Sequence, residues 1–366
     1  MKLLTFIFLI AFPLHAVPVF IGTYTGGNST SKGIYLADFD SATGVLSQPL
    51  LAAEYAGPGF LALHPAKPIL YSIGRPAEAY ADGSSSVAAF GIGEKNQLTF
   101  LGDTTVGGKG ACHLVVDATG RTVAIANYGD GSISTVRLDE NGVPGEVATL
   151  IQNKGSGPHE RQKGPHAHGV YFDKANKHLF VPDLGLDQVL VYPFDAATGK
   201  LGKPLPPLIT APGAGPRHMT FSPDEKHAYV INELDNTMLG ASYQDGSFKA
   251  LGTLSTLPAD FTGGTTAEVE VHANGNFVYG SNRGHDSIVV YRRNSESGGL
   301  THLQNAPCGG KIPRHFKIDP SGKWLLCGHQ ESHSISVLAL DPESGMLGEP
   351  SRTVASPSPI CILFGR

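Results

Sequence analysis

The sequence predicts an all-β fold, a closed seven-bladed β-propeller of four-stranded antiparallel blades whose N- and C-terminal strands share one blade. Three observations predict it. The chain repeats one unit along most of its length, each unit alternates short β-rich runs with tight turns, and the two chain ends carry complementary parts of one further unit. The units begin near residues 60, 112, 167, 217, 267 and 314, and a spacing of roughly 46 to 55 residues is typical of propellers and solenoids.

The unit between Pro216 and Gly246 illustrates the pattern. An alternating run leads through a Ser-Pro-Asp turn into a second β-rich run, and a polar turn precedes a third run. Three short strands joined by tight turns form a meander, to which a propeller blade adds a fourth strand. Near-copies of this unit begin at Phe60, Cys112, His166, Ala267 and Pro313.

The two ends of the chain distinguish a closed ring from an open array. The run from Pro18 resembles the second strand of a unit and the run from Gly33 resembles the third, but no first strand precedes them. The segment from Ser356 to Phe364 has the form of that missing first strand. A blade completed by both ends closes the ring and removes sheet edges that would otherwise stay unpaired. We therefore expect residues 17–366 to form one propeller domain.

Residues 1–16 have the features of a secretory signal peptide. Lys2 is followed by an apolar run and by a Leu-His-Ala ending, and the apolar core is shorter than the roughly 20 residues that span a bilayer. We expect cleavage after Ala16 and a periplasmic or secreted protein. The alternative is that this segment is a buried N-terminal strand, in which case the protein is cytoplasmic.

Composition and charge exclude several classes of partner. The net charge of -5 comes without a basic run, which argues against nucleic acid, and no later segment is long and apolar enough to span a membrane. We expect a monomer that binds a small molecule. The chain has four cysteines, none in a CxxC motif: Cys112, Cys308, Cys327 and Cys361. Because three of them fall within predicted strands, we expect free, buried thiols rather than disulfides, and the spacing makes no metal motif.

Polar residues gather at two positions of the repeat. In a propeller the first strand of each blade is innermost and the second runs antiparallel to it, so first-strand starts and second-strand ends meet at one mouth of the channel. The first-strand starts carry His166, His168, Arg217, His218, Glu268, Arg314 and His315. The second-strand ends carry Tyr24, Arg75, Asn127, Tyr128, Asp183, Glu233, Arg283 and His329. Charges gathered at a partly desolvated mouth interact strongly, so this rim is the candidate active site; ion pairs that merely bridge blades are the structural alternative.

The His-Ala-His sequence at 166–168 places two imidazoles on one face of a predicted strand, because residues i and i+2 share a face. A metal site needs a third ligand, and the neighbouring rim residues are largely arginines, which repel cations. We therefore expect no metal and no other cofactor. Arg217 and Arg283, with Arg161 or Arg75, offer forked donors to a carboxylate or phosphate, so an anionic ligand is expected.

Several stretches closely resemble the bacterial lactonase family of seven-bladed propellers, which includes the propeller-type 6-phosphogluconolactonases and is related to fungal 3-carboxy-cis,cis-muconate lactonizing enzymes. The resemblance extends from about Val19 to Phe364 and is most specific in Gly-Pro-Arg-His (215–218), Asn-Glu-Leu (232–234) and Ser-Asn-Arg-Gly-His-Asp-Ser (281–287). It implies a metal-independent site at the rim, in which the family's catalytic residues fall on His168, Glu233, Arg217 and Arg283. Substrate contacts are expected from Arg161, His166, His218, Glu268, His285 and Arg314.

Three functional classes are open at this point. In the first, which we favour, a sugar-acid lactone is hydrolysed: His168 or Glu233 acts as general base on water, while Arg217 and Arg283 hold an anionic group and stabilise the oxyanion. In the second, a carboxymuconate is cyclised by an acid that protonates carbon beside a clamped carboxylate. The third is a non-catalytic propeller that binds a ligand or a protein.

The predicted export bears on the identity of the lactone. An exported enzyme would not normally meet a phosphorylated cytosolic intermediate. Either the substrate is another lactone, such as an aldonolactone, or residues 1–16 are not a signal peptide.

Overall fold

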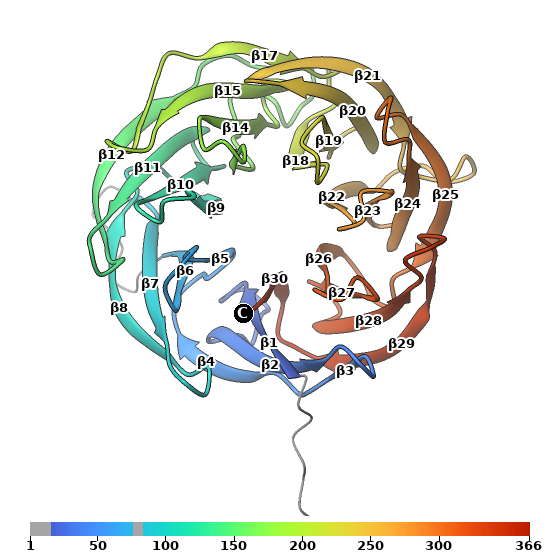
Figure 1. The fold of residues 1–366 in the computed structure, drawn as a ribbon, viewed down its shortest axis with the longest axis horizontal. Helices are drawn as coiled ribbons and strands as arrows, with labels where there is room; N and C mark the ends of the chain where they lie inside the picture. The colour runs from blue at the N-terminus through green and yellow to red at the C-terminus, as the bar shows by residue number, and fades with distance from the viewer. Residues whose placement is uncertain (1–15, 76–82) are drawn as a thin grey trace, which may run out of the picture.

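The computed structural model describes residues 16–75 and 83–366, which form a ring of seven antiparallel sheets around a central axis (Figure 1). The predicted seven-bladed, all-β propeller is confirmed. The predicted signal peptide lies outside the described residues except for Ala16, with which the first strand begins. Within the described part of the chain, no helix is long and apolar enough to cross a membrane.

Each blade runs from an inner strand next to the axis to an outer strand at the perimeter (Figure 1). The inner strands of blades one to seven are β5 (Leu61–Leu63), β9 (Ala111–Val116), β13 (Tyr171–Phe172), β18 (Pro216–Phe221), β22 (Thr265–Val271), β26 (Pro313–Ile318) and β30 (Pro359–Phe364). The second strands are β6 (Ile69–Gly74), β10 (Thr122–Asn127), β14 (His178–Asp183), β19 (His227–Asn232), β23 (Phe277–Arg283), β27 (Trp324–His329) and β1 (Ala16–Thr23).

The third strands are β7 (Ser86–Ile92), β11 (Ser132–Leu138), β15 (Gln188–Asp195), β20 (Thr237–Gln244), β24 (Ser287–Arg293), β28 (Ser334–Leu340) and β2 (Gly33–Asp40). The outer strands are β8 (Leu98–Thr105), β12 (Pro144–Gln152), β17 (Leu205–Ile209), β21 (Ser247–Ser255), β25 (Leu300–Pro307), β29 (Leu347–Ala355) and β4 (Leu50–Glu54). Two short strands, β3 (Val45–Leu46) and β16 (Lys200–Leu201), add to β2 and β15.

The seventh blade is built from both ends of the chain, as predicted. β1 pairs antiparallel with β2 on one side and with β30 on the other, where Val19 faces Phe364 and Ile21 faces Ile362. In Figure 1 the first and last strands accordingly lie side by side. This closure completes the seventh blade with its innermost strand and joins the two chain ends within one sheet.

The hydrophobic core lies between neighbouring blades rather than at the axis. One cluster, for example, joins Phe277 and Ile288 of blade five to Phe316 and Leu338 of blade six. Repeated hydrogen bonds add to this packing, because a buried second-strand tyrosine donates to a glycine carbonyl of the next blade. The pairs are Tyr71–Gly142 (2.7 Å), Tyr229–Gly298 (2.8 Å) and Tyr279–Gly345 (2.9 Å). All three glycines have positive φ, at 84°, 73° and 79°, a conformation that other residues adopt only with strain.

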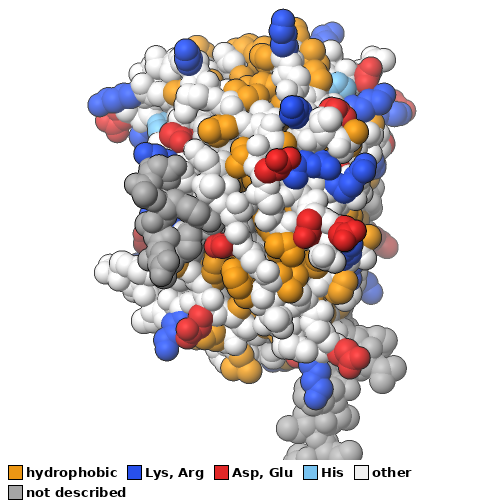
Figure 2. Space-filling model, turned by 90° about the vertical axis from the view of Figure 1, so that its left-hand side faces the viewer, with side chains coloured by type: hydrophobic (Ala, Val, Ile, Leu, Met, Phe, Trp, Pro, Cys, Tyr) orange, Lys and Arg blue, Asp and Glu red, His pale blue; other side chains and the backbone are white. Residues whose placement is uncertain are grey.

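The perimeter carries most of the exposed large apolar side chains. They include Leu50, Leu51, Phe100, Leu101, Leu150, Ile209, Leu251 and Leu254, all on outer strands. On the side of the ring drawn in Figure 2, charged side chains are interspersed among the apolar ones. Charged residues along an exposed strand oppose its pairing with another chain.

Blade three departs from the sequence prediction at its inner strand. The regular strand β13 starts only at Tyr171, so the prediction that 166–168 is strand is wrong; Ala167 makes just an isolated bridge to Asp183. Opposite this segment stands Pro182. His168 N donates to Pro182 O (2.9 Å), but proline has no N–H to return the bond, and the ladder is interrupted there.

Candidate active site

The predicted rim forms where the starts of the inner strands meet the ends of the second strands. Glu233, the residue after β19, stands at its centre, and its backbone N–H donates to Gly215 O (2.7 Å) just before β18. Gly215 has a φ of 65°, and a Cβ there would lie 2.6 Å from Leu234. This turn therefore needs glycine to bring Glu233 beside the neighbouring Arg217.

Glu233 is paired with three arginines that come from different parts of the chain. Its Oε1 lies 2.7 Å from Arg161 Nη1 and 3.1 Å from Arg283 Nη2, and its Oε2 lies 3.2 Å from Arg217 Nε. Burial by itself raises the pKa of Glu233, but the three guanidinium groups outweigh it and bring the pKa to about 2. Glu233 is thus a carboxylate at any physiological pH.

Backbone carbonyls hold two of these arginines in place. Arg283 donates from Nε and Nη2 to Thr266 O (3.1 and 2.6 Å), and Arg217 donates from Nη1 to Ala267 O (2.8 Å). Burial lowers the pKa of both, that of Arg283 to about 10, which leaves it charged at neutral pH. The Nε–H of Arg217 contacts Glu233 without hydrogen-bond geometry, so this buried donor has no hydrogen-bond partner among the described residues.

His168 lies against the same carboxylate. Its Nε2 is 3.9 Å from Glu233 Oε2, and its ring meets those of Tyr128 and His218 edge-on at 5.3 and 5.2 Å. Burial lowers the pKa of His168 well below 6.5, and the charge of Arg217 lowers it further. His168 is therefore a neutral imidazole at neutral pH, with a nitrogen lone pair that can accept a proton.

A second group of polar side chains lies beside the first, inside the ring. His218 Nε2 accepts from Arg217 Nη1 (3.2 Å), so its Nδ1–H donates to Glu268 Oε2 (3.0 Å). His315 Nδ1 accepts from Ile362 N (3.1 Å), which turns its Nε2–H toward the same oxygen at 3.4 Å. Burial lowers the pKa of both imidazoles, that of His315 to about 3. Two neutral histidines thus solvate the Glu268 carboxylate, and Arg217 connects the two groups.

A cavity of about 350 Å³ opens next to these groups, a volume in the range of small-molecule sites. Arg217 and His218 line it together with Arg314 and Arg75, and the lining residues Cys112 and Arg217 contact His168 and Glu233 directly. The guanidinium of Arg314 stacks over the ring of Tyr24 at 5.3 Å. Among the described residues, neither Arg314 nor Arg75 forms an ion pair with a carboxylate. Their charge is free to face an anion in the cavity.

Cys112 also lines this cavity and contacts His168. Its Sγ lies 3.3 Å from His168 O and 3.9 Å from His168 Nδ1. Burial raises the pKa of the Cys112 thiol to about 12. Cys112 is therefore a neutral thiol that packs against His168, and the thiolate needed for a nucleophile is absent at neutral pH.

Most of the sequence-predicted site residues come together, and two do not. His168, Glu233, Arg217, Arg283 and Arg161 form the first group, His218 and Glu268 the second, and Arg314 lines the cavity.

His166 and His285 lie apart from these groups. His166 stacks on Tyr128 (4.6 Å) and its Nδ1 bonds Tyr128 O (2.8 Å). His285 bonds Ser287 Oγ (2.7 Å) and packs on Phe261. The rings of His166 and His168 both contact Tyr128, but only His168 reaches Glu233.

Sequence reasoning missed one member of the inner group. The ring of His113 lies 5.1 Å from His218 and 4.1 Å from Phe60. The repeat register contains the signal, because His113 occupies the same position of its inner strand as His218 and His315 do in theirs. An alignment of the repeats residue by residue identifies all three.

Comparison with known proteins gives extensive matches. Residues 18–364 match the family described as Lactonase, 7-bladed beta-propeller. A 6-phosphogluconolactonase from Bacillus subtilis (strain 168) is 36% identical over 350 residues, which cover 94% of this chain and 97% of the relative. A 6-phosphogluconolactonase from Formosa agariphila is 30% identical over 335 residues, 90% of this chain and 94% of the relative.

Solved structures give the same picture. The periplasmic gluconolactonase PpgL of Pseudomonas aeruginosa superposes with a TM-score of 0.88 at 28% identity, covering 95% of this chain and 99% of that chain. These matches confirm the resemblance inferred from the sequence.

Proposed function

Because the chain belongs to the lactonase family of seven-bladed β-propellers, we propose that it hydrolyses the lactone of an anionic sugar acid at the rim of the ring. The observation that carries this proposal is a cavity lined by two cations, Arg314 and Arg75, that have no carboxylate partner among the described residues, close to the neutral imidazole of His168. Relatives named 6-phosphogluconolactonase and gluconolactonase support a sugar lactone as the substrate.

Arg314 and Arg75 are assigned to the anionic group of the substrate, a carboxylate or a phosphate. Glu233 already neutralises part of the charge of Arg161, Arg217 and Arg283, so these three are poorer receptors for a second anion. Guanidinium groups bind both anions through paired hydrogen bonds. The lactone ring then lies toward Arg217, whose guanidinium lines the cavity and can donate to the carbonyl oxygen.

His168 is assigned as the general base. It takes a proton from water as the water oxygen adds to the lactone carbonyl, and the negative charge that develops on the carbonyl oxygen is stabilised by Arg217 and Arg283. The carbon–oxygen bond of the ring then breaks, and the imidazolium returns its proton to the leaving ring oxygen. One water is consumed, and the product is a hydroxy acid that ionises and releases a proton.

The choice of His168 over Glu233 follows from the charges around each. With a pKa of about 2, the Glu233 carboxylate has little affinity for a proton, and its contact with His168 stabilises the imidazolium instead. The charges of Arg217 and Arg314 lower the pKa of His168. An anionic substrate offsets that charge, so its binding raises the basicity of His168 at the moment of reaction.

The remaining parts of the proposal concern location and assembly. We propose that residues 1–16 direct export and that the enzyme acts in the periplasm as a monomer. The periplasmic relative supports the location. In that compartment a carboxylate-bearing or plain sugar lactone is a more accessible substrate than a phosphorylated one.

The test is ring opening followed as proton release in weak buffer, with chelator-treated protein and three substrates: δ-gluconolactone, its 6-phosphate and a glucarolactone. We expect acceleration over the spontaneous rate for at least one substrate, with the anionic lactones having the lower KM. If no lactone opens faster than in buffer, the hydrolase proposal is wrong. In that case, cyclisation of 3-carboxymuconate would assign the site to the cycloisomerase class, and inactivity there would leave a binding propeller.

A further inference from the structure

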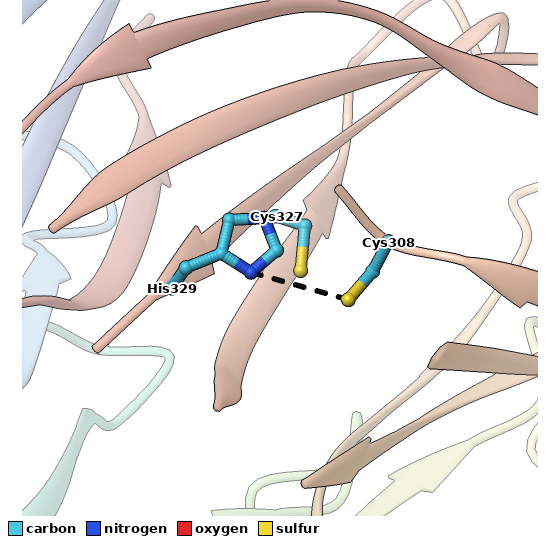
Figure 3. A group of neighbouring side chains, drawn as sticks. All are labelled: Cys308, Cys327 and His329. Carbon is cyan, nitrogen blue, oxygen red and sulfur yellow. Dashed lines mark hydrogen bonds between the residues drawn. The ribbon is translucent and has the colours of Figure 1, made fainter. Parts of the chain in front are cut away.

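Three side chains outside the active site converge where blade five meets blade six: Cys308, Cys327 and His329 (Figure 3). Cys308 follows the outer strand β25, whereas Cys327 and His329 lie two residues apart on β27 and so share one face. Their ligand atoms all lie within 4.8 Å of one another, and all three residues are fully buried, with 0% exposure. Two sulfurs and one ring nitrogen therefore face a common point.

The hydrogen bonds around His329 determine which of its nitrogens carries the lone pair. Ser336 Oγ donates its single hydrogen to Cys308 O (2.6 Å), so it accepts from His329 Nε2–H (2.8 Å). In the neutral ring the lone pair is therefore on the other nitrogen, Nδ1, which lies 4.0 Å from Cys308 Sγ, as the dashed line in Figure 3 marks. A hydrogen-bond partner that orients the far nitrogen of a histidine in this way is typical of metal sites.

We propose that Cys308, Cys327 and His329 bind one thiophilic d¹⁰ cation, Zn²⁺ or Cu⁺, as a structural site. Two thiolates and an imidazole suit both ions, since soft sulfur ligands select Zn²⁺ and Cu⁺ over harder cations. This site is separate from the rim groups around Glu233, and no step of the proposed hydrolysis involves the metal.

The spacing is close to what such an ion requires. A metal about 2.3 Å from sulfur and about 2.0 Å from nitrogen holds those two atoms about 3.5–3.7 Å apart at tetrahedral or trigonal angles. The present 4.0 Å between Cys308 Sγ and His329 Nδ1 needs a contraction of only a few tenths of an ångström. Cu⁺ is satisfied by three donors. Zn²⁺ takes a fourth, for which the carbonyl of Gly310, 3.5 Å from Cys308 Sγ, is the nearby candidate.

The ion would stabilise the segment between Cys308 and β26, which leads to the cavity. Cys308 begins the short segment that leads into β26, the strand that carries Arg314. That segment bends sharply, with Ile312 at a φ of 60° and its N–H bonded to Asp286 Oδ1 (2.9 Å). Tying Cys308 to β27 stabilises this bend, so metal binding should raise the thermal stability of the protein.

To test the proposal, reduced, full-length mature protein is incubated with Zn²⁺ in one experiment and with Cu⁺ in another. Unbound metal is removed by dialysis, and the bound metal is measured by elemental mass spectrometry. We expect one equivalent in the arm of the preferred ion and a raised melting temperature. Cys308→Ser and Cys327→Ser should each lose the bound metal. Cys361→Ser is the matched control, because Cys361 is also buried in a strand but has no ligand partners nearby among the described residues.

A second measurement uses only the wild-type protein, so it remains informative if the serine variants fail to fold. X-ray absorption spectra of the loaded wild-type protein should contain two sulfur neighbours at about 2.3 Å and a nitrogen at about 2.0 Å. The proposal is overturned if neither ion binds stoichiometrically, or if the double variant of Cys308 and Cys327 keeps the metal. It is also overturned if the protein isolated from its host holds a disulfide between these two cysteines in place of a metal.

Discussion

Replacement of Glu233 by glutamine tests the electrostatic core of the site. The pKa of Glu233 falls from an ordinary 4.5 to about 2 in the folded protein. A shift of this size corresponds to about 3 kcal/mol of folding free energy. Because the folded-state pKa is lowered, this contribution is complete above about pH 4.5 and is lost as the pH falls toward 2. Glu233→Gln should therefore destabilise the protein by about 3 kcal/mol at pH 7, and by progressively less in acid.

The same value follows from the structure by a second route. Breaking a buried ion pair from one side costs about 3–5 kcal/mol, since the remaining charges stay desolvated, and Arg217 and Arg283 are both largely buried here. The assay is urea unfolding of wild-type and variant protein at pH 7 and pH 3. Glu349→Gln is the control, because Glu349 is exposed on β29. The reasoning is refuted if the stability difference at pH 7 is below about 1 kcal/mol, or if it is as large at pH 3 as at pH 7.

Four further predictions concern the site, the ring and the N-terminus. His168→Ala should lower kcat by about 10²–10⁴, and wild-type kcat/KM should stay level as the pH falls through 6.5, because the pKa of His168 lies well below that value; a loss centred at 6.5 would contradict its assignment. Arg314→Ala should raise KM for an anionic lactone by about tenfold or more and leave KM for δ-gluconolactone nearly unchanged; equal effects on both would remove Arg314 from anion binding. Deletion of Ser356–Arg366 removes the inner strand β30, so cooperative thermal unfolding should be lost, and an unchanged melting temperature would argue against closure as a source of stability. Mass spectrometry of protein from its host should find Val17 as the first residue, and retention of Met1 in cytoplasmic protein would overturn the predicted export.

Much of the fold could be predicted from the sequence, because the information is local and repeated. Alternation with period two marks the strands, turn residues mark their ends, and six similar units set the register. The incomplete runs near Pro18 and Ser356 predicted the shared blade, which the pairing of β1 with β30 confirms. Once the register is known, antiparallel pairing alone gathers first-strand starts and second-strand ends at one rim, so Glu233, Arg217 and His168 could be grouped before their contacts were known.

Only the tertiary structure shows which rim residues pair with one another and which remain available to a ligand. The sequence contains the charges but not their pairing, and Glu233 takes Arg217 and Arg283 as partners. The anion is therefore proposed to bind Arg314 and Arg75 rather than Arg217 and Arg283. Tertiary packing also decided that His168 reaches Glu233, whereas His166 stacks on Tyr128.

The cluster of Cys308, Cys327 and His329 lay outside any motif for a similar reason. Its members are brought together by two blades that pack against each other, and sequence spacing does not encode that approach. The sequence by itself determined the number of blades, the closure of the ring and most of the residues at its rim, because these depend on local periodicity and its repetition. Ion-pair partners, protonation states and the cysteine cluster depend on distances of a few ångströms between strands of different blades, and only the packed structure sets those distances.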